Sequence, residues 1–278
     1  MNHKPELSIV TLTKNDNCGF NSSFFSLLKQ DFKGNIEWII VDGSNKKQFN
    51  YNAKSLKSQL VHFKDKIPFG LDLHHIFLSK EIINGIYGSM NYGIKMCNGR
   101  SIIFLNGGDE FYNSNSIRLL LDPHQKNNFF KTVSFGQANI ISEFGINWLF
   151  PGNKLSKIYY WLKYFEPNHQ AMLVSSDIAK NVEFEETSKI SADKFWKRKV
   201  ISLAKNVVYI RKPVCKFKLD GLSSKRPTFK ILKQEIQDKK ISNLRKIIIF
   251  IRFLIIPFFY KYIPFLQKFK SFIVDLIF

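Results

Sequence analysis

The sequence predicts an α/β fold with a mostly parallel sheet, because short apolar runs alternate with helix-length segments over most of the chain. Three runs of apolar and β-branched residues are expected to form strands: 8–13, 37–41 and 101–105. Helices are expected over three segments bounded by capping residues or glycine: 21–34, 86–96 and 113–121. In such sheets ligands bind beyond the carboxyl ends of the strands, so the polar residues that follow each run are the first candidates for chemistry.

The composition fits a packed protein with polyanionic partners. Of the 278 residues, 45% are hydrophobic and 23% charged, which supports a substantial core and excludes wholesale disorder. Lys and Arg number 42 against 22 Asp and Glu, and the net charge of +20 favours nucleotide phosphates, an anionic membrane face or nucleic acid. Three widely spaced cysteines predict neither a disulfide framework nor a cysteine zinc site, and suit a reducing compartment. With no secretory signal visible, we expect an intracellular protein.

The chain changes character after Pro227, so we expect one domain over 1–225 and a basic amphipathic helical segment over 226–278. No uncharged run in this segment reaches the roughly 18 to 20 residues of a spanning helix. Apolar side chains are instead interleaved with basic ones, as in helices that lie in a membrane interface. The alternative is an apolar helix that docks on the core.

Two motifs follow expected strands directly. Asp42 ends the run 37–41 and precedes Gly43, so its carboxylate can accept hydrogen bonds from a nucleobase or ribose, although Asp-Gly is also a common turn. Asn106-Gly107-Gly108-Asp109 follows the run 101–105. Its glycines allow a diphosphate to approach the backbone, and its carboxylate can hold Mg²⁺ or Mn²⁺, with a plain turn as the alternative.

A third carboxylate, Asp193, falls in the first turn of an expected helix, where it is either a cap or a general base for an attacking hydroxyl. The histidines do not indicate a zinc site. His169-Gln170 has no metal-ligand spacing to another His or Cys, and the adjacent His74 and His75 point apart on a strand. No nucleophile elbow, Walker loop or dinucleotide fingerprint is present in the sequence.

The order of the motifs resembles that of the family 2 glycosyltransferases. The matching blocks are Thr11 to Asn15, Val41 to Ser44, Gly85 to Lys95, Phe104 to Asp109, His169 to Ala171, Ser191 to Asp193 and Gly221 to Ser224. The resemblance covers about residues 7–224 and is closest to small bacterial enzymes that add sugars to exopolysaccharide, capsule or O-antigen repeat units.

The resemblance implies a GT-A, Rossmann-like fold, a nucleotide-sugar donor, a divalent cation (Mn²⁺ or Mg²⁺) and inversion at the anomeric carbon by a single displacement. It implies Asp109 as the metal residue and Asp193 as the catalytic base. The residues expected to bind the nucleotide sugar or shape its pocket are Thr13, Asp42, Asn91, Asn106, Gly107, Gly108, His169 and Gln170. The expected acceptor is a glycan or lipid-linked glycan, which would place a cytoplasmic enzyme on the inner face of the cell membrane, against anionic lipid.

Three positions depart from the family pattern. Ile83 and Gly88 stand where the family usually has acidic residues that help hold the donor, and Lys194 follows the expected base in place of an aromatic residue. A degenerate, non-catalytic member is therefore one alternative. The charge and the 15% of aromatic residues also suit a nucleic-acid-binding protein, but the basic residues concentrate in the C-terminal apolar segment, so nucleic acid is not the expected partner.

Overall fold

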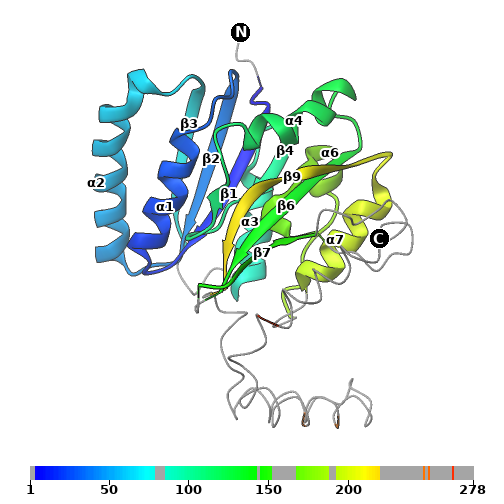
Figure 1. Ribbon diagram of the computed structural model, residues 1–278. Coiled ribbons are helices and arrows are strands. Elements are labelled where there is room, and N and C mark those ends of the chain that lie inside the picture. Colours follow the sequence, from blue (N-terminus) through cyan, green and yellow to red (C-terminus); the bar gives the residue numbers. More distant parts are fainter. Residues whose placement is uncertain are drawn as a thin grey trace.

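The computed structural model describes residues 4–78, 85–142, 145–151, 167–187 and 192–219, together with Ile247, Phe250 and Phe265. Over these residues the chain forms one mixed sheet in the order β3-β2-β1-β4-β8-β6-β9-β5, with β7 paired to β6 (Figure 1). The strands are β1 (Leu7–Thr13), β2 (Asn35–Asp42), β3 (Gly70–Phe77), β4 (Ser101–Phe104), β5 (Glu110–Phe111), β6 (Thr132–Ile141), β7 (Asn147–Phe150), β8 (Met172–Ser175) and β9 (Asn206–Lys218).

Helices cover both faces of the sheet (Figure 1). They are α1 (Asn17–Leu28), α2 (Lys46–Phe63), α3 (Gly85–Met96), α4 (Ser116–Lys126), α6 (Ser176–Ala179) and α7 (Ala192–Leu203), with the short 3₁₀ turns η1 (Lys64–Lys66) and η2 (His169–Ala171). The predicted α/β class is confirmed. The first helix nevertheless begins earlier than predicted, because Asp16 accepts a hydrogen bond from Gly19 N (2.9 Å), and it ends at Leu28, before Gly34.

The three predicted strands are β1, β2 and β4, and they pair in parallel at the centre of the sheet. β3 extends this parallel half at the edge, whereas β8 pairs antiparallel to both β4 and β6. The register places Thr13 opposite Asp42, and Asp42 opposite Phe77. The last residues of three neighbouring strands therefore meet at one edge of the sheet, which we call the carboxyl edge.

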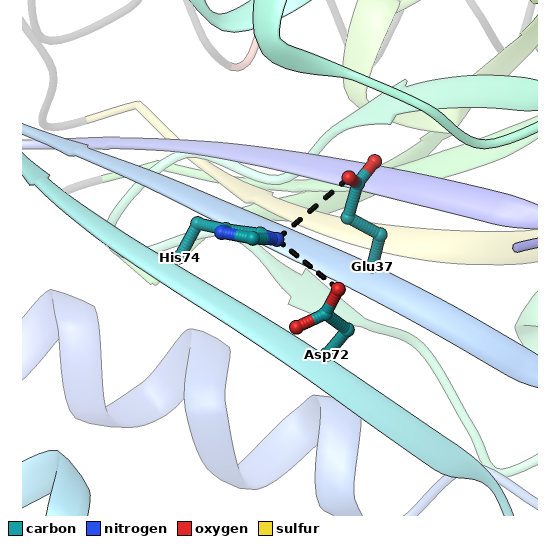
Figure 2. Close-up of side chains that lie close together, drawn as sticks. All are labelled: Glu37, Asp72 and His74. Carbon is teal, nitrogen blue, oxygen red and sulfur yellow. Dashed lines mark hydrogen bonds and ion pairs between the residues drawn. The ribbon is translucent and has the colours of Figure 1, made fainter. Parts of the chain in front are cut away.

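The opposite end of these strands is held by a buried carboxylate. Glu37 accepts hydrogen bonds from Ser8 Oγ (2.5 Å), Asn98 N (2.7 Å) and Asn98 Nδ2 (2.8 Å). His74 Nε2 lies 3.8 Å from Glu37 and 3.2 Å from Asp72 (Figure 2). Burial by itself would raise the pKa of Glu37, but the hydrogen bonds that it accepts from Ser8 and Asn98 bring the pKa below its usual value. Glu37 lies five residues before Asp42, about 17 Å along the strand. The cluster of Glu37, Asp72 and His74 is therefore remote from the carboxyl edge and belongs to the part of the sheet that supports it.

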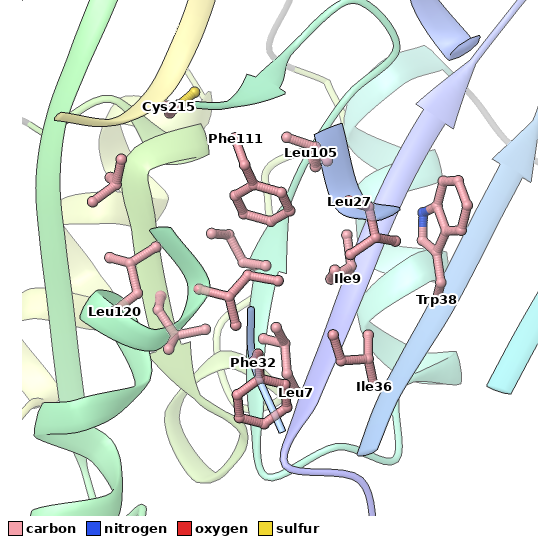
Figure 3. Packing of buried hydrophobic residues seen from close by; sticks show 14 of the residues in the cluster. Leu7, Ile9, Leu27, Phe32, Ile36, Trp38, Leu105, Phe111, Leu120 and Cys215 are labelled. Atoms are coloured by element: carbon pink, nitrogen blue, oxygen red, sulfur yellow. The ribbon is translucent and has the colours of Figure 1, made fainter. Parts of the chain in front are cut away.

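Burial on both faces fixes the central strands. On β2, Ile36, Trp38 and Ile40 pack toward α1, and Ile39 and Val41 pack toward α3. Figure 3 shows the α1 side, where Trp38 lies among Leu27, Ile9 and Ile36. A shift of the register by one residue would exchange the two buried faces, so this packing also fixes the position of Asp42 at the end of β2.

The described residues contain no helix that is both long enough and apolar enough to span a membrane. The predicted helical segment 226–278 lies outside the described residues, apart from three exposed side chains, those of Ile247, Phe250 and Phe265.

Candidate active site at the carboxyl edge

Asp42 organises the carboxyl edge. Its Oδ1 accepts a hydrogen bond from Ser44 N (2.9 Å), and its Oδ2 lies 2.9 Å from Asn52 Nδ2 on α2 and 3.0 Å from His75 Nε2 on β3. Burial would raise the pKa of Asp42, but the hydrogen bonds from His75, Ser44 and Asn52 lower it below its usual value, so the carboxylate is charged at neutral pH. Asp42 is fully buried and joins β2, α2 and β3; its contact with a nucleoside remains a prediction.

The loop that follows β4 is folded against the end of β1. Gly107 N donates to Leu12 O (3.0 Å), and Thr13 lies beside it, with its Oγ1 3.5 Å from the position that a Cβ on Gly107 would take. Gly108 has a φ of +95°, a backbone conformation that favours glycine. The predicted glycine turn is therefore present, and at Gly108 it depends on glycine.

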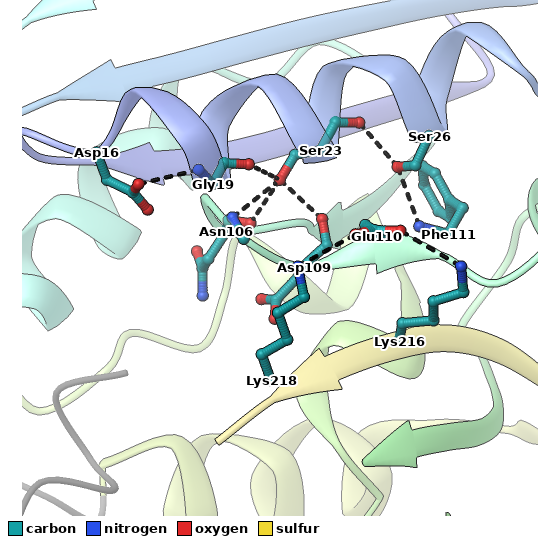
Figure 4. A network of polar contacts seen from close by, with 11 residues as sticks. Asp16, Gly19, Ser23, Ser26, Asn106, Asp109, Glu110, Phe111, Lys216 and Lys218 are labelled. Atoms are coloured by element: carbon teal, nitrogen blue, oxygen red, sulfur yellow. Dashed lines mark hydrogen bonds and ion pairs between the residues drawn. The ribbon is translucent and has the colours of Figure 1, made fainter. Parts of the chain in front are cut away.

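A serine of α1 holds this turn from the other side (Figure 4). Ser23 Oγ lies 2.7 Å from Asp109 O and 3.0 Å from Asn106 O, and it accepts a hydrogen bond from Gly108 N (3.2 Å). Asp109 itself is buried. The next carboxylate, Glu110, forms ion pairs with two lysines of β9, Lys216 and Lys218, each at 3.4 Å.

The turn fits a hard divalent cation. Among the described residues, Asn106 Oδ1 is a buried oxygen without a hydrogen-bond partner, and the Asp109 carboxylate follows three residues later in the same turn. Carboxylate and amide oxygens are the ligands that suit Mg²⁺ and Mn²⁺. Asn106 Oδ1 and the carboxylate of Asp109 are therefore the oxygens of this turn suited to hold such an ion.

Asp193 lies in the first turn of α7, as predicted, and the structure brings two further groups to it. His169 Nδ1 on η2 lies 3.9 Å from Asp193 Oδ2, and Lys197 Nζ, one helical turn along α7, lies 3.4 Å from the same oxygen. Burial lowers the pKa of His169 to about 4, with the charge of Lys197 acting in the same direction and that of Asp193 against it. His169 is therefore neutral at pH 7, and the site combines a carboxylate, an ammonium and a neutral imidazole.

Stacked aromatic rings fix α7 against the sheet. Phe184 stacks on Trp196 of α7 (4.7 Å between centroids) and on Tyr87 of α3 (5.9 Å), and Phe104 at the end of β4 meets Trp196 edge-on (5.9 Å). Trp196 Nε1 also donates to Val182 O (2.9 Å). The first turn of α7, and with it Asp193, is thus tied to the end of β4.

Asn91 supports this arrangement from α3. Its Nδ2 donates to Phe184 O (2.9 Å) and Glu186 Oε1 (3.2 Å), and its Oδ1 accepts from Phe184 N (2.7 Å). The side-chain amide therefore holds the segment before α7, and a direct contact with the sugar nucleotide remains a prediction. Of the departures from the family pattern, Gly88 is buried on α3, Lys194 is exposed on α7 and Ile83 lies outside the described residues.

Buried polar atoms without a partner gather at the carboxyl edge. Among the described residues six side-chain atoms are of this kind, and five belong to residues at or beside this edge: Thr13 Oγ1, His75 Nδ1, Asn106 Oδ1, His169 Nε2 and Gln170 Oε1. The sixth, Asn115 Oδ1, lies just before α4. Buried polar groups in folded proteins nearly always have partners, so unsatisfied atoms concentrated in one region indicate a place where a ligand or water completes them.

Sequence reasoning missed three contributors: His75, which contacts Asp42; Phe49, whose ring lies 4.3 Å from that of His75; and Lys197. His75 reaches Asp42 through the pairing of β3 with β2, and Phe49 reaches His75 from α2, so neither contact leaves a local signal. Lys197 did leave one, since a residue four positions after a carboxylate shares its helix face.

Comparisons with known proteins identify the family and the fold of this chain. Residues 8–178, more than half of the chain, match glycosyl transferase family 2. The crystal structure of residues 1–349 of S. aureus TarS aligns with a TM-score of 0.53 at 15% identity, over 90% of this chain and 70% of that one. The complex of the same TarS fragment with UDP-GlcNAc aligns with a TM-score of 0.55 at 16% identity, over 90% and 71%.

Against the longer S. aureus TarS structure the TM-score is 0.54 at 16% identity, and this chain covers 43% of that one. At such identities these alignments show a shared fold. The comparison with curated proteins found no match. The matched range contains β1, β2, β4 and the Asn106–Asp109 turn, and on this evidence the chain belongs to glycosyl transferase family 2 and is a glycosyltransferase with a GT-A fold.

Proposed function

We propose that the protein transfers a sugar, with inversion, from a nucleotide-sugar donor to a hydroxyl group of a glycan acceptor. The observation that carries this proposal is the set of unpaired buried polar atoms along the carboxyl edge, between the Asn106–Asp109 turn and Asp193. Two of the TarS structures contain UDP-GlcNAc or UDP, which supports a uridine nucleotide as the first donor to test.

The proposed reaction divides the work between two ends of the site. Asp193 accepts the proton of the acceptor hydroxyl while the oxygen of that hydroxyl forms a bond to the anomeric carbon. The bond from that carbon to the diphosphate breaks in the same step, and the nucleoside diphosphate leaves. Asp109 and Asn106 would hold a divalent cation, which when bound neutralises charge on the departing diphosphate. The proposed glycosyltransferase reaction gives Asp193, Asp109 and Asn106 each a role, whereas the nucleic-acid-binding alternative gives them none.

The first test is the effect of ligands on thermal stability. UDP with Mn²⁺ is expected to raise the melting temperature of the full-length protein above that with Mn²⁺ alone, because a ligand that binds only the folded state stabilises it, by about 2.7 kcal/mol at a hundredfold excess over Kd. Differential scanning fluorimetry with UDP, GDP, CDP and ADP would rank the nucleotides. If none of them shifts the transition, with or without Mn²⁺, the nucleotide-sugar assignment is wrong and the degenerate, non-catalytic alternative is favoured.

We further propose that the acceptor is lipid-linked, as in capsule or O-antigen synthesis, and that residues 226–278 hold the enzyme on the inner membrane face. The support is the recurrence of lysine and arginine among apolar residues in that segment, together with the exposed Ile247, Phe250 and Phe265. A basic residue near an anionic surface contributes about 1 kcal/mol, and inserted apolar groups add a contribution that salt does not screen.

Co-sedimentation with vesicles tests this attachment. Full-length protein is expected to pellet with vesicles rich in phosphatidylglycerol, less so at 0.5 M salt, whereas a chain ending at Lys225 is expected to stay in the supernatant and still bind UDP. Neutral phosphatidylcholine vesicles serve as the control for the electrostatic part. Full-length protein that ignores both kinds of vesicle would show that the segment docks on the core or on another copy.

A further inference from the structure

A buried lysine stands beside the proposed base. The side chain of Lys197 is 9% exposed, although lysine is almost never buried unless it is paired. It lies on α7 four residues after Asp193, so the two side chains share one face of the helix, and its Nζ is 3.4 Å from Asp193 Oδ2. The other lysines of α7, Lys194 and Lys199, are exposed. The burial and the pairing of Lys197 thus distinguish it within its own helix.

The groups that face Asp193 from other elements do not carry out the same task. His169, on η2, is neutral and lies 3.9 Å from Oδ2, beyond hydrogen-bond distance. Tyr87, on α3, also stays neutral: burial raises its pKa, the charge of Asp193 raises it further, and the N–H groups of Asp193 and Ala192 lower it in part. Among the residues that the structure describes, Lys197 is therefore the group that places a positive charge beside Oδ2.

We infer that Lys197 is a positioning residue for Asp193, holding Oδ2 so that Oδ1 is left for the acceptor hydroxyl. This inference rests on the proposed function, because it takes Asp193 as the base. An aspartate side chain has two rotatable bonds, and an ion pair to a lysine whose own stem is packed removes much of that freedom. A misplacement of about 1 Å at a reacting group costs on the order of 100-fold in rate, so loss of the ammonium should reduce turnover and leave donor binding unchanged.

Substitutions at Lys197 test this role through its charge. Lys197→Met keeps the length and apolar stem of the side chain but removes the ammonium, and Lys197→Arg keeps a cation. We expect Lys197→Met to lower kcat about 10- to 100-fold with UDP affinity and melting temperature unchanged, and Lys197→Arg to recover most of the turnover. Lys199→Met, on the exposed side of the same helix, is the matched control and is expected to behave as wild type. Lys197→Gln provides a second uncharged variant if the methionine variant does not fold.

The result is separable from that of the proposed function. If Asp193→Asn is inactive but Lys197→Met and Lys197→Gln retain kcat within twofold of wild type, the base assignment stands and the role of Lys197 is wrong. If Asp193→Asn is fully active, the base assignment itself fails. In the double variant Asp193→Asn/Lys197→Met we expect no further loss beyond Asp193→Asn alone, since two residues that act as a unit are not additive. An additional loss in the double variant would show that Lys197 acts independently of Asp193 and would overturn the inference.

Discussion

Replacement of Asp193 by asparagine is expected to abolish sugar transfer and to leave nucleotide binding nearly intact. Asparagine has the same shape but cannot accept a proton, and removal of a general base costs on the order of 10²- to 10⁴-fold in rate. The neighbouring imidazole is a poor substitute, because burial has already lowered the pKa of His169 to about 4. Turnover would be measured as UDP release with a glycan acceptor, alongside the Kd for UDP and the melting temperature.

A carboxylate in the first turn of a helix also stabilises that helix, so the effect of Asp193→Asn needs a control for this role. Asp177 offers one, since it lies in the first turn of α6 and is exposed. We expect Asp177→Asn to change stability by no more than about 1 kcal/mol and turnover not at all. Near-wild-type turnover of Asp193→Asn would show that Asp193 is not the general base and only stabilises the start of α7.

The parallel half of the sheet could be predicted from sequence because its strands are buried on both faces. β1, β2 and β4 therefore appear as short continuous apolar runs bounded by turns. β3 was not predicted: it is an edge strand on which apolar and polar residues mix (Leu71, Asp72, Leu73, His74), and its half-buried pattern is weak. β8 and β9 owe their places to antiparallel or long-range pairing with β4 and β6, which no local pattern records.

In the candidate site, too, some positions could be predicted from sequence and others depend on tertiary contacts. The positions of Thr13, Asp42 and Asp109 could be predicted because each lies at or shortly after the carboxyl end of a strand, and parallel strands bring these ends to one edge. The position of His169 beside Asp193 could not, because η2 and α7 come together through tertiary contacts, among them the ring of Phe104, which meets both His169 and Trp196. The contacts of Asn91 with the segment before α7 could not be predicted either, because they depend on tertiary structure.

The Asn106–Asp109 turn leads to the second large effect. Asp109 is buried, and the backbone around it is fixed by Ser23 and by the bond from Asp109 N to Asn106 O (2.9 Å). Its neighbour Glu110 cannot easily take its place, because both oxygens of Glu110 lie 3.4 Å from lysine ammonium groups of β9. A cation at this turn would therefore depend on Asp109.

Asp109→Ala is accordingly expected to remove the metal-dependent part of nucleoside diphosphate binding. In wild type, Mn²⁺ should strengthen the binding of UDP, whereas in the variant the affinity for UDP should be the same with and without Mn²⁺. In the presence of Mn²⁺ the variant should therefore bind UDP at least 10- to 100-fold more weakly than wild type, by analogy with the cost of disturbing groups around a bound metal. Isothermal titration calorimetry at fixed Mn²⁺ and in EDTA measures this difference. Glu110→Ala is the matched control: it removes the adjacent carboxylate and its lysine pairs, and it should keep the metal dependence. If Asp109→Ala also keeps it, Asp109 is a structural turn residue and the diphosphate is neutralised by other groups.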